Sequence, residues 1–397
     1  MARGLVAGLL YRDLGLGFEE AYAVLADVPP EELMDVQRGW DGGGGGGTRT
    51  HIVHGSKRLT VLDTTIEANS APAISAEYGV QSVSVAATTA AVSNAFDDQI
   101  ETEAGTVRSL HFNRQVDLVQ SCARVSAVTG HVVHDTLPPA GCFGTTVQGM
   151  GLAFAVRAVA VRRVGGRIPT SQFTARRVVV LGAGACTLPA YLYTAFPGIT
   201  VDAVERSAEV LAVARQQFRM ADLEAASGGR FRLHGACAYA WTRANSSALA
   251  GQVDILIADL QDGDAVGGLV APQADILAPE MLQALKAMLA PCGVMAVNTI
   301  GTGGAIAQVA ARMRATEACL PPTHGEARRS IATTEGASVQ VSHSILFYRN
   351  DGSGEKVSAD DILRELHSLP PLVDDPPAWL AAWEQLPPKQ GEVNEIL

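Results

Sequence analysis

The clearest pattern in the chain is an alternation of short apolar runs with amphipathic segments in its second half. Val178–Leu181 is a continuous apolar run, which favours a central parallel strand buried on both faces. The pattern then changes to helical spacing, through Ala190, Leu192 and Ala195. Further strands are predicted at Thr200–Glu205, Arg230–His234, Val253–Asp259 and Val294–Thr299, and further helices at Ala208–Phe218, Pro279–Leu289 and Ala305–Ala318.

Two β-rich segments follow these units. Arg328–Thr333 and Ser338–Tyr348 are separated by a Glu-Gly turn and predict a terminal hairpin. Five parallel strands closed by an antiparallel hairpin at one edge make a doubly wound, Rossmann-like α/β sheet. We expect this domain to span residues 141–350. The tail, residues 351–397, should be helical, with Ser358 capping one helix and Asp361 three residues later.

The first third of the chain has a different pattern. Residues 1–47 combine a short helical appendage with a linker of six consecutive glycines, Gly42 to Gly47. Residues 48–140 are β-rich and predict a small antiparallel lid region with one solvent-facing side. Its strands are predicted at Arg58–Asp63, Val80–Ala86, Val107–Asn113, Leu118–Val128 and His131–Asp135, and a helix at Phe143–Val164 leads into the main domain.

Composition limits the partners and the compartment. The formal net charge of −11 argues against nucleic acid as the main partner, because phosphate binding needs a basic surface. No run reaches the ~18 apolar residues of a membrane span, and no signal-peptide pattern follows the apolar patch near the N-terminus. The six cysteines are scattered, without a C-x-x-C pair. We therefore expect a cytoplasmic protein that binds neither nucleic acid nor membrane.

The candidate site begins where the first βα unit turns, at Gly182-Ala183-Gly184. Glycines at the carboxyl end of a buried strand allow a sharp turn and a close approach of a ligand. Glu205 ends the next strand, where a carboxylate can accept hydrogen bonds from both ribose hydroxyls of an adenosine cofactor. The alternative is a structural turn with an ordinary surface glutamate. The combination of strand, glycines, helix and acidic residue favours the cofactor.

The same turn distinguishes between two kinds of adenosine cofactor. The dinucleotide fingerprint G-x-G-x-x-G requires a third glycine at position 187, which is Thr187 here. Pro189 opens the following helix, whereas a pyrophosphate favours a glycine-rich helix N-terminus. An adenosyl sulfonium therefore fits this turn better than a nicotinamide dinucleotide.

Asp259, at the end of the fourth strand, is the candidate catalytic residue. Strand ends at this edge face the ligand crevice, where a carboxylate could stabilise a sulfonium or accept a proton from a substrate amine. Asp262 and Asp264 follow it and are equally well explained as a hydrophilic loop. Asn298, at the end of the fifth strand, is similarly placed but less specific.

Other chemistries are disfavoured. The pairs His51/His54 and His131/His134 have i, i+3 spacing, which on a strand directs the side chains to opposite faces, so no metal site is expected. No G-x-S-x-G hydrolase turn occurs. Cys237 follows the third strand, near where an adenine would lie, and its simplest interpretation is an inert, partly buried thiol.

Three segments carry a resemblance to a known family. Residues 179–189 (VVLGAGACTLP), 196–205 (FPGITVDAVE) and 293–298 (GVMAVN) are similar to the spermidine synthase-like class I methyltransferases. The resemblance is greatest to the C-terminal domain of the elongation factor 1A lysine and N-terminal methyltransferases and covers about residues 105–350. It implies S-adenosylmethionine as cofactor and a protein amine as acceptor. It also implies that Gln120 contacts the amino-acid end of the cofactor.

The chain departs from that family at two places. It lacks the aspartate of the glycine-rich loop of aminopropyltransferases, which disfavours polyamine synthesis. Cys237-Ala238 stands where the family has an Asp-Gly whose carboxylate holds the adenine amino group. We therefore expect a methyltransferase in which Gln120, Gly182, Gly184, Glu205, Cys237 and Asp259 bind the cofactor. The alternatives are an aminopropyltransferase-like enzyme and a catalytically weak or non-catalytic member of the fold.

Overall fold

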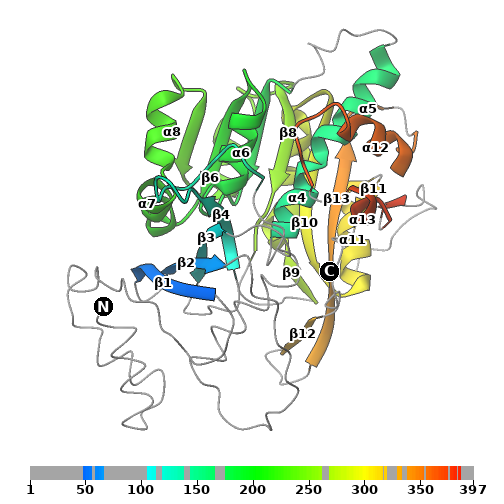
Figure 1. The fold of residues 1–397 in the computed structure, drawn as a ribbon. Helices are drawn as coiled ribbons and strands as arrows, with labels where there is room; N and C mark the ends of the chain where they lie inside the picture. The colour runs from blue at the N-terminus through cyan, green and yellow to red at the C-terminus, as the bar shows by residue number, and fades with distance from the viewer. Residues whose placement is uncertain are drawn as a thin grey trace.

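The computed structural model describes two β-sheets of unequal size together with the helices around the larger one (Figure 1). The described residues are 48–55, 59–66, 105–112, 119–137, 144–165, 175–261, 268–315, 317–319, 329–332, 338–352, 355–373, 376–381 and 383–385. The predicted appendage at residues 1–47, the predicted strand Val80–Ala86, and Asp262 and Asp264 lie outside them.

The larger sheet contains the five predicted parallel strands. They are β5 (Arg177–Leu181), β6 (Thr200–Glu205), β7 (Phe231–Gly235), β8 (Val253–Ala258) and β10 (Leu289–Gly301). Their order is β10-β8-β5-β6-β7, with every neighbouring pair parallel. The first strand is central, and the chain crosses over it between β7 and β8. This order defines a doubly wound, Rossmann-like sheet and confirms the predicted fold class.

Antiparallel strands extend the sheet beyond β10. The predicted hairpin is confirmed as β12 (Arg329–Ala332) paired with β13 (Ser338–Arg349). β13 also pairs with β10, and it is not the edge, because β11 (Glu317–Cys319) and β14 (Trp383–Gln385) continue the sheet. A further short strand, β9 (Leu269–Ala271), pairs with the end of β10. β9, β11 and β14 were not predicted, because three residues are too few to show a period of two.

Helices cover both faces of the larger sheet. Val178 and Val180 belong to one buried cluster and Val179 and Leu181 to another, so β5 is buried on both faces, as its apolar run predicted. The first cluster includes side chains of α5, α6 and α7, and the second includes side chains of α9, α10 and α11. The bounds are α5 Ala153–Gly165, α6 Thr187–Ala195, α7 Ala208–Gln217, α8 Met220–Ala226, α9 Ala238–Asn245, α10 Pro279–Met288 and α11 Gly303–Met313.

Two further helical segments lie before and after the parallel strands. The single helix expected at Phe143–Val164 is divided into α4 (Gly144–Gly151) and α5, and the division follows Gly149 and Gly151, which are poor helix formers. In the tail, α12 (Ala359–Leu366) begins with the predicted capping box, and α13 (Pro376–Ala381) follows. A 3₁₀ turn, Ala274–Leu277, precedes α10. Among the described helices, none combines the length and the apolar character needed to cross a bilayer.

The smaller sheet is antiparallel, in the order β1-β2-β3-β4. Its strands are β1 (Thr48–Gly55), β2 (Leu59–Ile66), β3 (Gly105–Phe112) and β4 (Val119–Val125). β1 was not predicted. The strand predicted at His131–Asp135 is only a bridge between Val132 and Val125.

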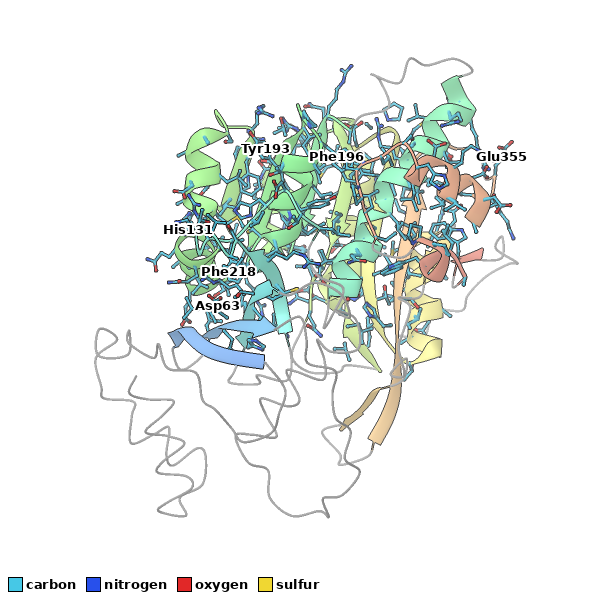
Figure 2. The ribbon with its side chains drawn as sticks, in the orientation of Figure 1. Asp63, His131, Tyr193, Phe196, Phe218 and Glu355 are labelled. Atoms are coloured by element: carbon cyan, nitrogen blue, oxygen red, sulfur yellow. The ribbon has the colours of Figure 1, made fainter. Side chains whose placement is uncertain are left out.

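The smaller sheet contacts the larger domain at α7. Asp63 of β2 lies just below Phe218, which follows α7, in Figure 2. Arg108 of β3 binds the Asp63 carboxylate with two hydrogen bonds of 2.7 Å, and its Nη1 donates to the carbonyl of Gln217 over 2.7 Å. This contact holds β4 beside the turn that follows β5.

Candidate active site

The turn after β5 requires glycine at two positions. Gly182 has a φ of +81°, and a Cβ there would lie 2.0 Å from the carbonyl oxygen of Asp259. Gly184 has a φ of +54°, and its Cβ would lie 2.8 Å from the Oγ atom of Ser121 on β4. Gly182 therefore lets the ends of β5 and β8 approach closely, and Gly184 makes room for the smaller sheet.

Every backbone N–H from residue 182 to residue 186 already has an acceptor within the chain. Gly182 and Ala183 both donate to the carbonyl of Val204, over 2.9 and 3.0 Å, and Cys186 donates to the carbonyl of Ala183 over 2.8 Å. Gly184 donates to Glu205 Oε2 over 3.1 Å, and Ala185 donates to Ser121 Oγ over 3.2 Å. A phosphate-binding turn leaves its backbone N–H groups free to donate to the ligand. Residues 182–186 therefore leave no backbone N–H group for a pyrophosphate.

Glu205 lies at the carboxyl end of β6 with its carboxylate fixed by two backbone groups. Oε2 accepts from Gly184, and Oε1 accepts from the N–H of Ser207 over 2.8 Å. Ser207 is also the predicted N-cap of α7, because its side chain accepts from Val210. An ionised carboxylate has about four acceptor sites, so about two remain for the hydroxyls of a ligand.

A small pocket, partly open to solvent, lies beside this turn. β4 contributes Gln120 and Ser121 to its lining, the turn contributes Gly182 and Gly184, and the end of β8 contributes Asp259. Four of the six predicted site residues are thus brought together from three separate elements. Glu205 adjoins them through its hydrogen bond to Gly184, whereas Cys237 does not line the pocket.

Asp259 has an unusual environment for a carboxylate. Burial raises its pKa to about 6, the nearby negative charge of Glu205 acts in the same direction, and a hydrogen bond from Asn298 opposes them. Asn298 Nδ2 donates to Asp259 Oδ1 over 2.7 Å. A carboxyl group with a pKa near 6 exchanges a proton readily close to neutral pH.

Asn298 is itself held by a histidine that the sequence did not suggest. His343, on β13, lies with its Nε2 atom 2.7 Å from Asn298 Oδ1, and Thr146 Oγ1 of α4 lies 3.3 Å from the same nitrogen. His343 is adjacent to the site only because β13 pairs with β10, with Ile300 opposite His343. The predicted hairpin indicated a strand there, but gave no register against β10.

Cys237 is exposed and forms the N-cap of α9, at the carboxyl end of the sheet next to β7. It was expected to be partly buried. Its neighbour Ala236 donates a backbone hydrogen bond to the carbonyl of Glu205 over 3.1 Å, so Cys237 lies on the Glu205 side of the site. The Cys186 thiol differs: it is buried, and burial raises its pKa far above the usual range.

The described residues contain no group of three or more histidine, cysteine or acidic side chains that could hold a metal ion. His131 is exposed and His134 is partly buried, while the side chains of His51 and His54 lie outside the described set.

Comparison with known proteins finds similar solved structures but no matching sequence family. No protein-family profile matches the chain, and no curated protein matches its sequence. A probable spermidine synthase from Corynebacterium glutamicum is 19% identical, with 66% of this chain and 81% of that chain covered, at a TM-score of 0.43. Human methyltransferase-like protein 13, solved in complex with SAH, is 21% identical, with 57% and 90% covered, at a TM-score of 0.41.

Spermidine synthase from Thermotoga maritima is 14% identical, with 64% of this chain and 71% of that chain covered, at a TM-score of 0.37. At these scores, neither the cofactor nor the reaction of those proteins transfers to this chain.

Proposed function

We propose that the protein is a methyltransferase that uses S-adenosylmethionine to methylate an amine. The observation that supports this most directly is the pairing of two carboxylates, Glu205 and Asp259, around a glycine turn whose N–H groups are all occupied. Such a site disfavours phosphate and favours a cationic ligand with ribose hydroxyls.

The residues present suit this cofactor at its ribose and methionine ends. Glu205 retains acceptor sites for the ribose hydroxyls, and Gly182 lines the pocket beside it. Gln120 lines the pocket from β4 and would contact the amino-acid end. Gly184 and Cys237 would border the turn and the adenine side. When bound, S-adenosylmethionine supplies an electrophilic methyl group, which an amine nitrogen can attack in line with the departing sulfur.

Asp259 is the proposed catalytic residue. An ammonium group must lose a proton before its nitrogen can attack, and a carboxylate that lines the pocket can hold the amine and accept that proton. With a pKa near 6, Asp259 is mostly ionised at neutral pH and hence ready to accept. Its place in the pocket lining would also bring a negative charge near a bound sulfonium.

The proposed acceptor is a protein amine, either a lysine or an N-terminal amine. The family resemblance suggests elongation factor 1A as the first candidate. The net charge of −11 favours association with a basic protein. The smaller sheet, which provides Gln120 and Ser121, would cover the methionine end as a lid, and we propose the cytoplasm as the site of action.

One observation favours a second candidate, an aminopropyltransferase-like enzyme. Gln120 lines the pocket at the place where the resemblance to polyamine synthases expects a glutamine. Formation of spermidine from decarboxylated S-adenosylmethionine and putrescine would establish this candidate and reject methyl transfer to a protein.

The exposed Cys237 favours a third candidate, a protein of this fold that lacks catalytic activity. For that candidate, S-adenosylmethionine should cause no thermal shift.

Calorimetric titration with S-adenosylmethionine tests the ribose assignment. Glu205→Ala should weaken binding about 100-fold, because two hydrogen bonds to a charged acceptor are lost. Glu205→Gln keeps one acceptor oxygen, so its S-adenosylmethionine affinity should lie between those of Glu205→Ala and the wild type. Glu280→Ala, an exposed glutamate on α10, should bind like the wild type and serves as the control. Equal affinity in the wild type and Glu205→Ala would reject the proposed site.

A further inference from the structure

A chain of polar side chains runs from the pocket into the protein. It links Asp259 to Asn298, Asn298 to His343, and His343 to Thr146, with heavy-atom separations of 2.7, 2.7 and 3.3 Å. The four residues come from the end of β8, from β10, from β13 and from α4. Asn298 and Thr146 are buried, being 3% and 2% exposed. Of the four, Asp259 is the one that lines the pocket.

Hydrogen-bond chemistry fixes the direction of this chain. An ionised carboxylate only accepts, so the amide nitrogen of Asn298 must face Asp259. The amide oxygen of Asn298 then faces His343 and needs a donor, which places a hydrogen on His343 Nε2. Thr146 Oγ1, at the longer distance, is left to accept from the same N–H.

We propose that His343 is a positioning residue for Asp259 and acts through the side-chain amide of Asn298. This inference rests on the proposed function, in which Asp259 receives a proton from the amine. Without the His343 donor, the amide of Asn298 loses the contact that holds its oxygen, and its nitrogen is no longer fixed toward the carboxylate. The hydrogen bond that favours the ionised form of Asp259 is then weakened.

The groups that act on Asp259 come from each neighbouring element. Burial disfavours the ionised carboxylate, and the charge of Glu205, at the end of β6, does the same. Asn298 of β10 is the group that favours ionisation. Because His343 fixes the orientation of Asn298, removing the imidazole should raise the pKa of Asp259 further, and removing Asn298 should do so too.

The experiment is an NMR titration of the full-length protein without cofactor. Carbon-13 labelling of aspartate carboxyls, with Asp259→Asn to assign the signal, should show Asp259 titrating near pH 6 in the wild type. In His343→Leu and Asn298→Leu the midpoint should rise by about one pH unit. His343→Gln retains an N–H donor and should restore the midpoint to within about half a unit.

A second readout does not depend on the folding of His343→Leu. Nitrogen-15 spectra of the wild-type imidazoles, assigned by loss of one signal in His343→Gln, should show His343 with its hydrogen on Nε2. A neutral ring with hydrogen on Nδ1 overturns the proposal, even if His343→Leu does not fold. An unchanged Asp259 midpoint in folded His343→Leu also overturns it.

Activity separates this inference from the proposed function. The acid limb of kcat/KM for methyl transfer should move to higher pH in His343→Leu by the same amount as the NMR midpoint. If the NMR results hold but neither methyl transfer nor S-adenosylmethionine binding is found, the proposed function fails and the positioning of Asp259 stands. If methyl transfer is found but the acid limb of the pH profile does not move in His343→Leu, the positioning role fails and the proposed function stands.

Discussion

At the scale of single residues, Gly182 is the most constrained position in the site. Two independent requirements coincide there, a left-handed backbone and the absence of a Cβ next to the Asp259 carbonyl. Gly198 shares only the first, since its φ is +92° but no atom lies within 4 Å of the place that a Cβ would take. Alanine at Gly198 therefore tests backbone strain alone, whereas alanine at Gly182 tests backbone strain together with a steric clash.

Gly182→Ala should destabilise the protein by about 3 kcal/mol or more, because the methyl group would force β5 and β8 apart. Gly198→Ala, the matched control, should cost only about 1 kcal/mol of left-handed strain. Urea denaturation of both variants provides the measurement. Equal losses of stability in the two variants would show that β8 does not approach the turn as closely as described.

At the scale of elements, the site depends on how the smaller sheet meets the larger one. Arg108 connects Asp63 of β2 to the end of α7, with the two side chains 11% and 6% exposed. β3 pairs with β4, so this contact also sets the position of Gln120 and Ser121. A buried ion pair of this kind is costly to break from one side, because the remaining charge stays desolvated.

Arg108→Met keeps the apolar stem but removes the charge, and should destabilise the protein by about 3 kcal/mol. Adding Asp63→Asn to this variant should recover part of that loss, since the buried carboxylate is then neutral. S-adenosylmethionine affinity, measured by calorimetry on the folded fraction, should fall in Arg108→Met. Loss of stability with unchanged affinity would show that the smaller sheet does not position the pocket.

At the scale of the whole molecule, two buried carboxylates give stability opposite dependences on pH. Burial raises the pKa of Asp259. Burial also acts to raise the pKa of Asp202, but hydrogen bonds from His234 and Arg232 outweigh it, and that pKa is lowered. Asp202 therefore stabilises the fold above the pKa of the unfolded chain, and this contribution is lost as pH falls through its folded pKa. As pH rises, Asp259 ionises in the unfolded chain before it ionises in the folded protein. The folded state therefore loses stability between about pH 4 and pH 6.

Asp259→Asn should therefore gain stability relative to the wild type as pH rises from 4 to 6, by up to about 3 kcal/mol, and the difference should stay constant above pH 6. Asp202→Asn should behave in the opposite way, with a deficit at pH 7 that shrinks in acid. Urea denaturation at four pH values between 4 and 7.5 measures both. A difference for Asp259→Asn that does not vary with pH would contradict the burial of its carboxyl group.

The sequence by itself determined the parallel core of this protein and the first half of its site. The apolar run of β5, the glycines after it and Glu205 after β6 are local features, and a doubly wound sheet places consecutive strand ends at one edge. Gln120 came from the family resemblance, and Asp259 from the same edge rule. Each of these residues could be proposed without any knowledge of packing.

Only the tertiary structure decided the rest. The N–H of Ala185 in the turn depends on Ser121 from another sheet for its acceptor, and the link from Asp259 to His343 depends on the register of β13 against β10. Both are contacts between segments far apart in the chain, set by how sheets pack and pair rather than by local periodicity. For the same reason, the sequence could place Cys237 after β7 but could not show that its thiol faces solvent.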